Sequence, residues 1–109
     1  MAYDAALAER LRALLPDDSP FQEKAMFGGL AFLLGGRMCA GVVGDRVVLW
    51  LGREKAAAAI ARHPAAAPMD FTGRVMHNFI YLDPAGVADD AELSEWLADA
   101  VAAVEDRAG

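Results

Sequence analysis

Hydrophobic residues recur with a helical period at the N-terminal end of the chain. Four leucines fall at positions i, i+4, i+7 and i+8, along one stripe of a helix: Leu7, Leu11, Leu14 and Leu15. Asp4 lies near the start, where a carboxylate meets the positive end of the helix dipole. Pro16 marks the end, because proline disfavours helical geometry in the residue before it. The pattern therefore predicts a first helix between Asp4 and Pro16.

Segments that predict strands follow this helix, and all but the first are short apolar runs. They cover residues 21–26, 30–34, 38–43 and 46–51. Gly35-Gly36 and Gly44-Asp45 separate the later runs, and two-residue loops that contain glycine suit the primed turns of hairpins. In the last run both faces are apolar. We expect that strand either to be central and covered on both faces or to meet another subunit.

The glycine pairs Gly28-Gly29 and Gly35-Gly36 raise a functional question, because glycines can wrap a phosphate or turn a chain. A Walker-type loop needs G-x-x-x-x-G-K-[ST], with a lysine for the phosphates and a hydroxyl for magnesium. Residues 36–41 have the glycine spacing, but Val42 and Val43 follow them. No G-x-G-x-x-G motif occurs, and no helical pattern follows to supply a dipole. We interpret both pairs as turns.

The second half of the chain predicts a helix, two strands and a last helix. Gly52 and Pro64 bound an alanine-rich helical segment. Extended pieces at residues 68–71 and 75–83 follow, with a turn at Thr72-Gly73 between them.

Asp89 caps the last helix, with Glu92 as its capping-box partner. The apolar stripe of this helix comprises Leu93, Trp96, Leu97, Ala100, Val101 and Val104. The whole order is helix, three or four strands, helix, two strands, helix. Runs of strands predict an α+β, two-layer fold with a mainly antiparallel sheet, in a single domain of residues 1–109.

Composition and charge narrow the function classes. Hydrophobic residues make up 56 % of the 109 residues, and no apolar run approaches the roughly 18–20 residues of a membrane span. The N-terminal segment carries acids and no apolar core, so we do not expect a secretory signal. A single cysteine permits no internal disulfide and fits a reducing, cytoplasmic location.

The formal net charge is −6, and the acidic excess lies at the C-terminal end, with eight acids and one base in residues 83–109. Seven bases against four acids are scattered over residues 21–82. Such a surface repels a phosphate backbone, whose binding rests on clustered Lys and Arg. We therefore do not expect direct DNA binding.

Two sequence blocks resemble the N-terminal domain of the TfoX/Sxy family of competence regulators. They are "MFGGLAFLLGGRMCAGV" at residues 26–42 and "PMDFTGRVM" at residues 68–76. The resemblance covers nearly the whole chain, from Tyr3 through the last helix. It implies a helix–three strands–helix–two strands–helix fold like that of type III secretion chaperones. It also implies a link to transcriptional regulation of DNA uptake, acting through protein contacts.

One departure limits what the resemblance transfers. Two-domain members of the family carry a further helical domain, and this chain ends at Gly109 without one. Roles that need that domain are therefore not expected here. For stand-alone members the family implies no established activity.

The second block also holds the residues best suited to chemistry. His77 could approach Asp70 and Arg74 across the turn, and a histidine beside a carboxylate can act as a general acid or base. The planar guanidinium of Arg74 has paired N–H groups that suit a carboxylate or phosphate. A small anion pocket walled by Met26, Phe27 and Phe71 is one interpretation. The structural alternatives are an Asp70–Arg74 ion pair and a surface histidine.

Other reactive residue types favour structural roles. Cys39 lies two residues from Arg37 on one strand, which could stabilise a thiolate, but we interpret it as a small core residue. His63 at a helix end is expected to interact with the last carbonyls. Met26, Met38, Met69 and Met76 suit core packing or an adaptable binding surface, and we favour packing. Two histidines and one cysteine are too few for a closed zinc site, so no metal or cofactor is expected.

These observations favour a non-enzymatic module that contacts an unidentified protein partner, with a homodimer through an apolar sheet face as one form. The candidate binding residues are Met26, Phe27, Gly28, Gly29, Asp70, Phe71, Arg74 and His77. The alternative is a small-molecule, anion-binding protein or an enzyme that uses Asp70, Arg74 and His77.

Overall fold

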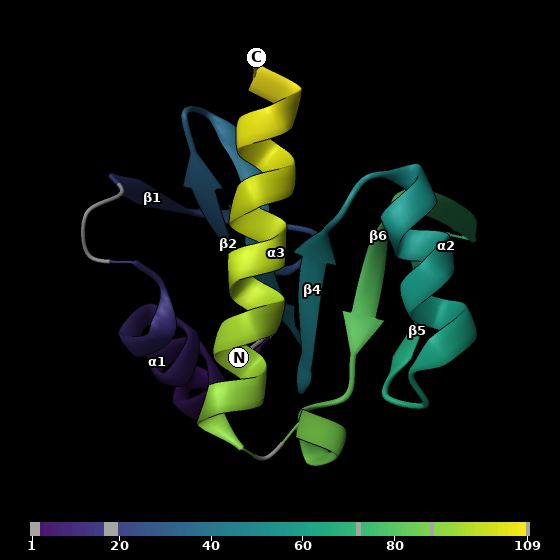
Figure 1. The fold of residues 1–109 in the computed structure, drawn as a ribbon. Helices are drawn as coiled ribbons and strands as arrows, with labels where there is room; N and C mark the ends of the chain where they lie inside the picture. The colour runs from purple at the N-terminus through teal and green to yellow at the C-terminus, as the bar shows by residue number, and fades with distance from the viewer. Residues whose placement is uncertain (1–2, 17–19, 72, 88, 109) are drawn as a thin grey trace.

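Antiparallel strands form one six-stranded sheet within residues 3–16, 20–71, 73–87 and 89–108, the part of the chain that the computed structural model describes (Figure 1). The strand order is β1-β2-β3-β4-β6-β5. The strands are β1 (Phe21–Met26), β2 (Gly29–Leu34), β3 (Arg37–Val43), β4 (Arg46–Trp50), β5 (Ala66–Phe71) and β6 (Arg74–Leu82). The helices are α1 (Ala5–Leu14), α2 (Arg53–Arg62) and α3 (Asp90–Ala108), with a 3-10 turn η1 (Pro84–Val87) before α3.

This architecture confirms the predicted α+β fold with a mainly antiparallel sheet. Four strands precede α2, and two lie between α2 and α3. The predicted turn at Thr72-Gly73 lies partly outside the described residues, because Thr72 is not among them. None of the described helices has both the length and the apolar character that a membrane span needs.

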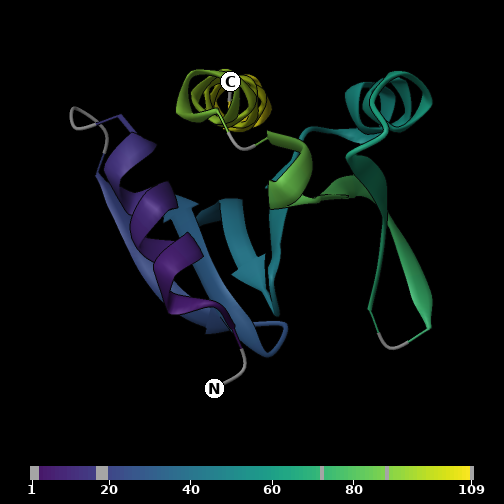
Figure 2. The same cartoon turned by 90° about the horizontal axis from the view of Figure 1, so that it is seen from below.

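The three helices contribute to one hydrophobic cluster on one face of the sheet. Buried residues of α1, α2 and α3 pack there with side chains of the strands. Figure 2 shows the sheet curving around this helical layer, while β5 and β6 extend away from it. We call this the helix-covered cluster.

Local hydrogen bonds place α1 and α3 where the sequence predicted them. The Leu7 amide donates to the Asp4 carboxylate at 3.1 Å, so Asp4 is the N-cap of α1. The Ala91 amide donates to the Asp89 carboxylate at 2.9 Å and gives α3 the same kind of cap. The predicted stripe of α3 is buried along its length. The starts of α1 and α3 are therefore set by capping residues that the sequence predicted.

A surface ion pair ties α1 to the edge strand β1. The Arg12 Nε atom lies 2.6 Å from a carboxylate oxygen of Glu23. This hydrogen bond to the guanidinium holds the pKa of Glu23 below its usual value. Both side chains are more than a third exposed, so the pair adds little stability.

The predicted turns are confirmed at Gly35-Gly36 and corrected at Gly28-Gly29. Gly35 and Gly36 have φ angles of 61° and 80°, the left-handed conformation that a primed hairpin turn requires. At the other pair the turn residues are Phe27 and Gly28, with φ angles of 56° and 73°. Gly29 is instead the first residue of β2.

Gly29 is required for a different reason, which is close approach of two strands. A Cβ atom at this position would lie 2.0 Å from the carbonyl oxygen of Val42 in β3. No side chain relaxation can relieve a contact with backbone. The second glycine of the pair therefore serves the packing of β2 on β3, and the first serves the turn.

The central strand β4 is covered on both faces within the chain. Val47 and Leu49 belong to the helix-covered cluster, whereas Val48 belongs to a second cluster on the other face. All three side chains are fully buried. The first of the two sequence interpretations for this strand is confirmed, and its apolar faces no longer argue for a subunit contact.

Substitution of the adjacent glycines separates their two roles. We expect Gly29→Ala to lower the free energy of unfolding by about 3 kcal/mol or more, because the added methyl group overpacks against backbone. Gly28→Ala should cost about 1–2 kcal/mol, the cost of the left-handed conformation alone. Urea denaturation of both variants measures the difference. Equal costs at the two positions would contradict the close-approach role of Gly29.

Candidate functional site

The two motif blocks meet on the face of the sheet that the helices leave open. Phe27, in the turn between β1 and β2, packs edge-to-face on Phe71 at the end of β5, with ring centroids 5.1 Å apart. The Phe27 ring also lies 6.1 Å from that of Phe79 in β6. We call these three rings the aromatic junction. It joins the turn that follows one edge strand to the hairpin at the opposite edge of the sheet.

Beneath the junction lies the second cluster, made of side chains from the strands and from the β1–β2 turn. Its buried members are Ala31, Leu33, Met38, Val48, Met69 and Tyr81, and its half-buried members are Met26, Phe27, Val43, Ala67, Met76 and Phe79. The four methionines of the motif blocks all belong to it, which confirms the packing interpretation. We call this the open-face cluster.

Tyr81 connects the open-face cluster to the surface around it. Its hydroxyl donates to the backbone carbonyl of Asp70 at 3.3 Å. The guanidinium carbon of Arg46 lies 3.9 Å from the centre of the Tyr81 ring, a cation–π distance. The hydrogen bond joins β6 to β5, and Arg46 of β4 gives the cluster a charged border.

The polar candidates of the second block lie at the surface and do not meet one another. Asp70, Arg74 and His77 are all exposed. Among the described residues, no ion pair or side-chain hydrogen bond joins any two of them. The strand register instead places Asp70 opposite Val75 and Phe71 opposite Arg74. The predicted Asp70–Arg74 ion pair is therefore wrong.

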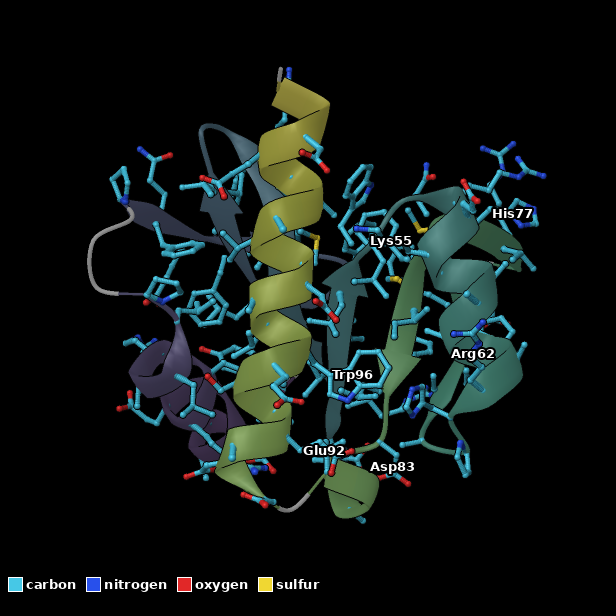
Figure 3. All side chains as sticks on the ribbon, viewed as in Figure 1. Lys55, Arg62, His77, Asp83, Glu92 and Trp96 are labelled. Atoms are coloured by element: carbon cyan, nitrogen blue, oxygen red, sulfur yellow. The ribbon has the colours of Figure 1, made fainter. Side chains whose placement is uncertain are left out.

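The structure thus divides the candidate binding residues. The turn and the apolar candidates come together at the aromatic junction and its rim: Met26, Phe27, Gly28, Gly29 and Phe71. The polar candidates remain unpaired side chains of the β5–β6 hairpin: Asp70, Arg74 and His77. Figure 3 shows His77 pointing outward at the edge of the molecule. Beside them Val75 is 46 % exposed, a large apolar side chain in open solvent.

Cys39 is a core residue with suppressed reactivity. It is 0 % exposed in the helix-covered cluster. Burial, with a smaller contribution from the charge of Glu105, raises the pKa of its thiol to about 12. Arg37 does not lower that pKa, so the thiolate interpretation finds no support and the core interpretation is confirmed.

His63 makes a contact that sequence reasoning did not predict. Its backbone amide donates to the Ala59 carbonyl at the end of α2. Its ring packs edge-to-face on Trp96 of α3, with centroids 4.9 Å apart. The histidine therefore links α2 to α3 through an aromatic contact.

This contact borders a cleft between α2 and α3, which the sequence analysis missed. The cleft has a volume of about 330 Å³, and Trp96, Ala59 and Leu51 contribute its apolar surface. Lys55 and Arg62 line it from α2. The available signal was the wide alanine face of α2, since small side chains leave space beside a neighbouring helix. Within the described residues no group of three or more potential metal ligands occurs.

Thiol labelling tests the burial of Cys39. At pH 8 we expect alkylation of the native protein by iodoacetamide to be at least ~100-fold slower than in denaturant, because a pKa near 12 instead of 9.0 leaves little thiolate. Mass spectrometry follows the reaction over time. Native labelling as fast as that of the unfolded chain would contradict the assigned environment.

Comparison with known proteins places the chain in a family. The sequence model of the TfoX N-terminal domain matches residues 13–104, a span that includes both motif blocks and every strand of the sheet. Searches of curated proteins and of solved structures find no match to the chain. The likeness to type III secretion chaperones therefore stays an expectation. With the match covering most of its length, the chain belongs to the TfoX N-terminal domain family.

Proposed function

We propose that this chain is a non-enzymatic protein-binding module that regulates transcription of DNA-uptake genes through protein contacts. Family membership supports a role in competence regulation. The partner is a protein of the transcription apparatus, which the chain contacts with the surface around the aromatic junction. A cytoplasmic location follows from that role.

One observation carries the proposal, which is the convergence of the two motif blocks on one surface. The blocks lie about forty residues apart in the sequence, yet Phe27 and Phe71 are in contact. The hairpin that carries Phe71 also carries the exposed Val75 and the charged side chains of Asp70 and Arg74, with Arg74 opposite Phe71 in the register. An apolar centre with a polar rim is the anatomy of a protein–protein interface.

The charge of the chain favours a protein partner over nucleic acid. The net charge of −6 opposes contact with a phosphate backbone, and the described acidic residues of α3 add to that field. Regulation through a protein partner needs no basic surface. A protein partner also suits the β5–β6 hairpin, which carries an unpaired acid, an unpaired base, an unpaired histidine and an exposed valine.

No contact supports the alternative, in which Asp70, Arg74 and His77 bind an anion or act in catalysis. Asp70, Arg74 and His77 are exposed side chains without bonds to one another in the described structure. A general base needs hydrogen-bond reach to its partner, and a phosphate site needs converging donors. The proposal therefore assigns Asp70, Arg74 and His77 to the rim of an interface.

A charge substitution at the hairpin tests this surface. We expect Val75→Glu to reduce binding of the RNA polymerase holoenzyme or a regulator purified from the native cell by about tenfold or more, because a carboxylate replaces exposed apolar surface. Transcription from DNA-uptake promoters should fall in parallel. Biolayer interferometry and a reporter assay measure the two effects.

Ala98→Glu is the matched control, because Ala98 is exposed on α3 in the helical layer. It should bind like the unsubstituted chain, and both variants should unfold at the same urea concentration. Equal binding by all three chains would contradict the assigned surface. A salt-dependent gel shift with promoter DNA alone would replace the proposal with direct DNA binding. Loss of a homodimer in Val75→Glu, measured by light scattering, would identify a second copy as the partner.

A further inference from the structure

The cleft between α2 and α3 has two walls of opposite charge. Lys55 and Arg62 line it from α2, and Glu92, Glu95 and Asp99 line it from α3. Figure 3 shows Trp96 reaching from α3 toward α2, with Lys55 and Arg62 on the facing helix and Glu92 near the start of α3. The cleft lies on the helix-covered side of the sheet, away from the aromatic junction.

The charges sit two helical turns apart on each wall. Lys55 and Arg62 are seven residues apart, as are Glu92 and Asp99, which corresponds to about 10 Å along a helix. Trp96 and Ala59 lie between these positions in the sequence of their helices. Each wall therefore presents charge at two levels, with apolar surface between them.

No ion pair joins the two walls in the described structure. The salt bridges there involve Arg10 with Asp90 and Arg12 with Glu9 and Glu23, all outside the cleft. Lys55 and Arg62 thus have donors available, and Glu92, Glu95 and Asp99 have acceptors available, for a molecule that enters between the helices.

Only one class of small molecule satisfies both walls. The three carboxylates of α3 repel an anion that has no positive charge, and the two bases of α2 repel a polyamine. A molecule that carries both charges is attracted by both sides. The apolar floor of Trp96, Ala59 and Leu51 favours a hydrophobic body between the charges.

We propose that this cleft binds a short apolar peptide, a zwitterion whose terminal ammonium and carboxylate groups flank an apolar body. The carboxylate pairs with Arg62, and the ammonium pairs with Asp99, both of which line the cleft. The apolar body covers the part of the Trp96 ring that faces the cleft. A volume of about 330 Å³ suits a ligand of this size, near the lower end of small-molecule sites.

Trp96 provides a direct reporter for this proposal. The probes are free phenylalanine, the dipeptide alanyl-phenylalanine and the tripeptide alanyl-phenylalanyl-alanine, titrated into the whole chain labelled with ¹⁵N. We expect a saturable shift of the Trp96 indole N–H signal with at least one probe. Because the two charges of free phenylalanine share one carbon atom, one of the peptides should bind best, and tightest binding by the free amino acid would contradict the proposal.

Capped probes and charge variants test the two-wall recognition. N-acetylation and C-amidation of the best probe should each weaken binding about tenfold, because each cap removes one charge pair. Arg62→Gln and Asp99→Asn should each weaken the uncapped probe to a similar extent. The matched controls Lys24→Gln and Asp45→Asn each remove one charge at an exposed position outside the cleft and should leave the affinity unchanged.

Several outcomes would overturn the assignment. These are no Trp96 shift with any probe at millimolar concentration, equal affinity for capped and uncapped probes, or equal loss in the cleft and control variants. None of them affects the proposed protein interface, which lies on the other side of the sheet. Binding of the tripeptide with loss in both cleft variants would establish the site independently of that interface.

Discussion

The fold depends on burying both faces of its central strands, and the helices can cover only one of them. The open face is covered because the β1–β2 turn reaches the β5–β6 hairpin, and the contact that joins them is between Phe27 and Phe71. Phe27 has a φ angle of 56°, a conformation that costs a non-glycine residue about 1–2 kcal/mol. The aromatic contacts and the burial of Met69 and Val48 beneath them offset that cost.

This arrangement explains why two distant blocks define the family resemblance. The first block supplies the turn that carries Phe27 and the glycine that lets β2 approach β3. The second block supplies Phe71 and the fully buried Met69. The same contact holds the β5–β6 hairpin, with its exposed side chains, against the β1–β2 turn. The proposed binding surface therefore uses residues that also cover the open face of the sheet.

Short-range signals in the sequence were enough for the elements and their order. Helix caps at Asp4 and Asp89, the glycine turn at Gly35-Gly36 and the leucine stripe of α1 act within a few residues, so a pattern can identify them. The Gly28-Gly29 turn was displaced by one residue, because the constraint on Gly29 comes from Val42 in another strand. The contact of Phe27 with Phe71 and the cleft beside Trp96 arise from tertiary packing, which no local pattern reports.

A double-mutant cycle on Phe27 and Phe71 tests the central contact most directly. The free energy of unfolding is measured for the unsubstituted chain, Phe27→Ala, Phe71→Ala and the double variant. Because these two rings join the edges of the sheet, the cycle should give a coupling free energy of about 0.5–1.5 kcal/mol, the range for aromatic pairs. Strict additivity of the two substitutions would show that the rings do not stabilise one another and would contradict this account of how the open face is covered.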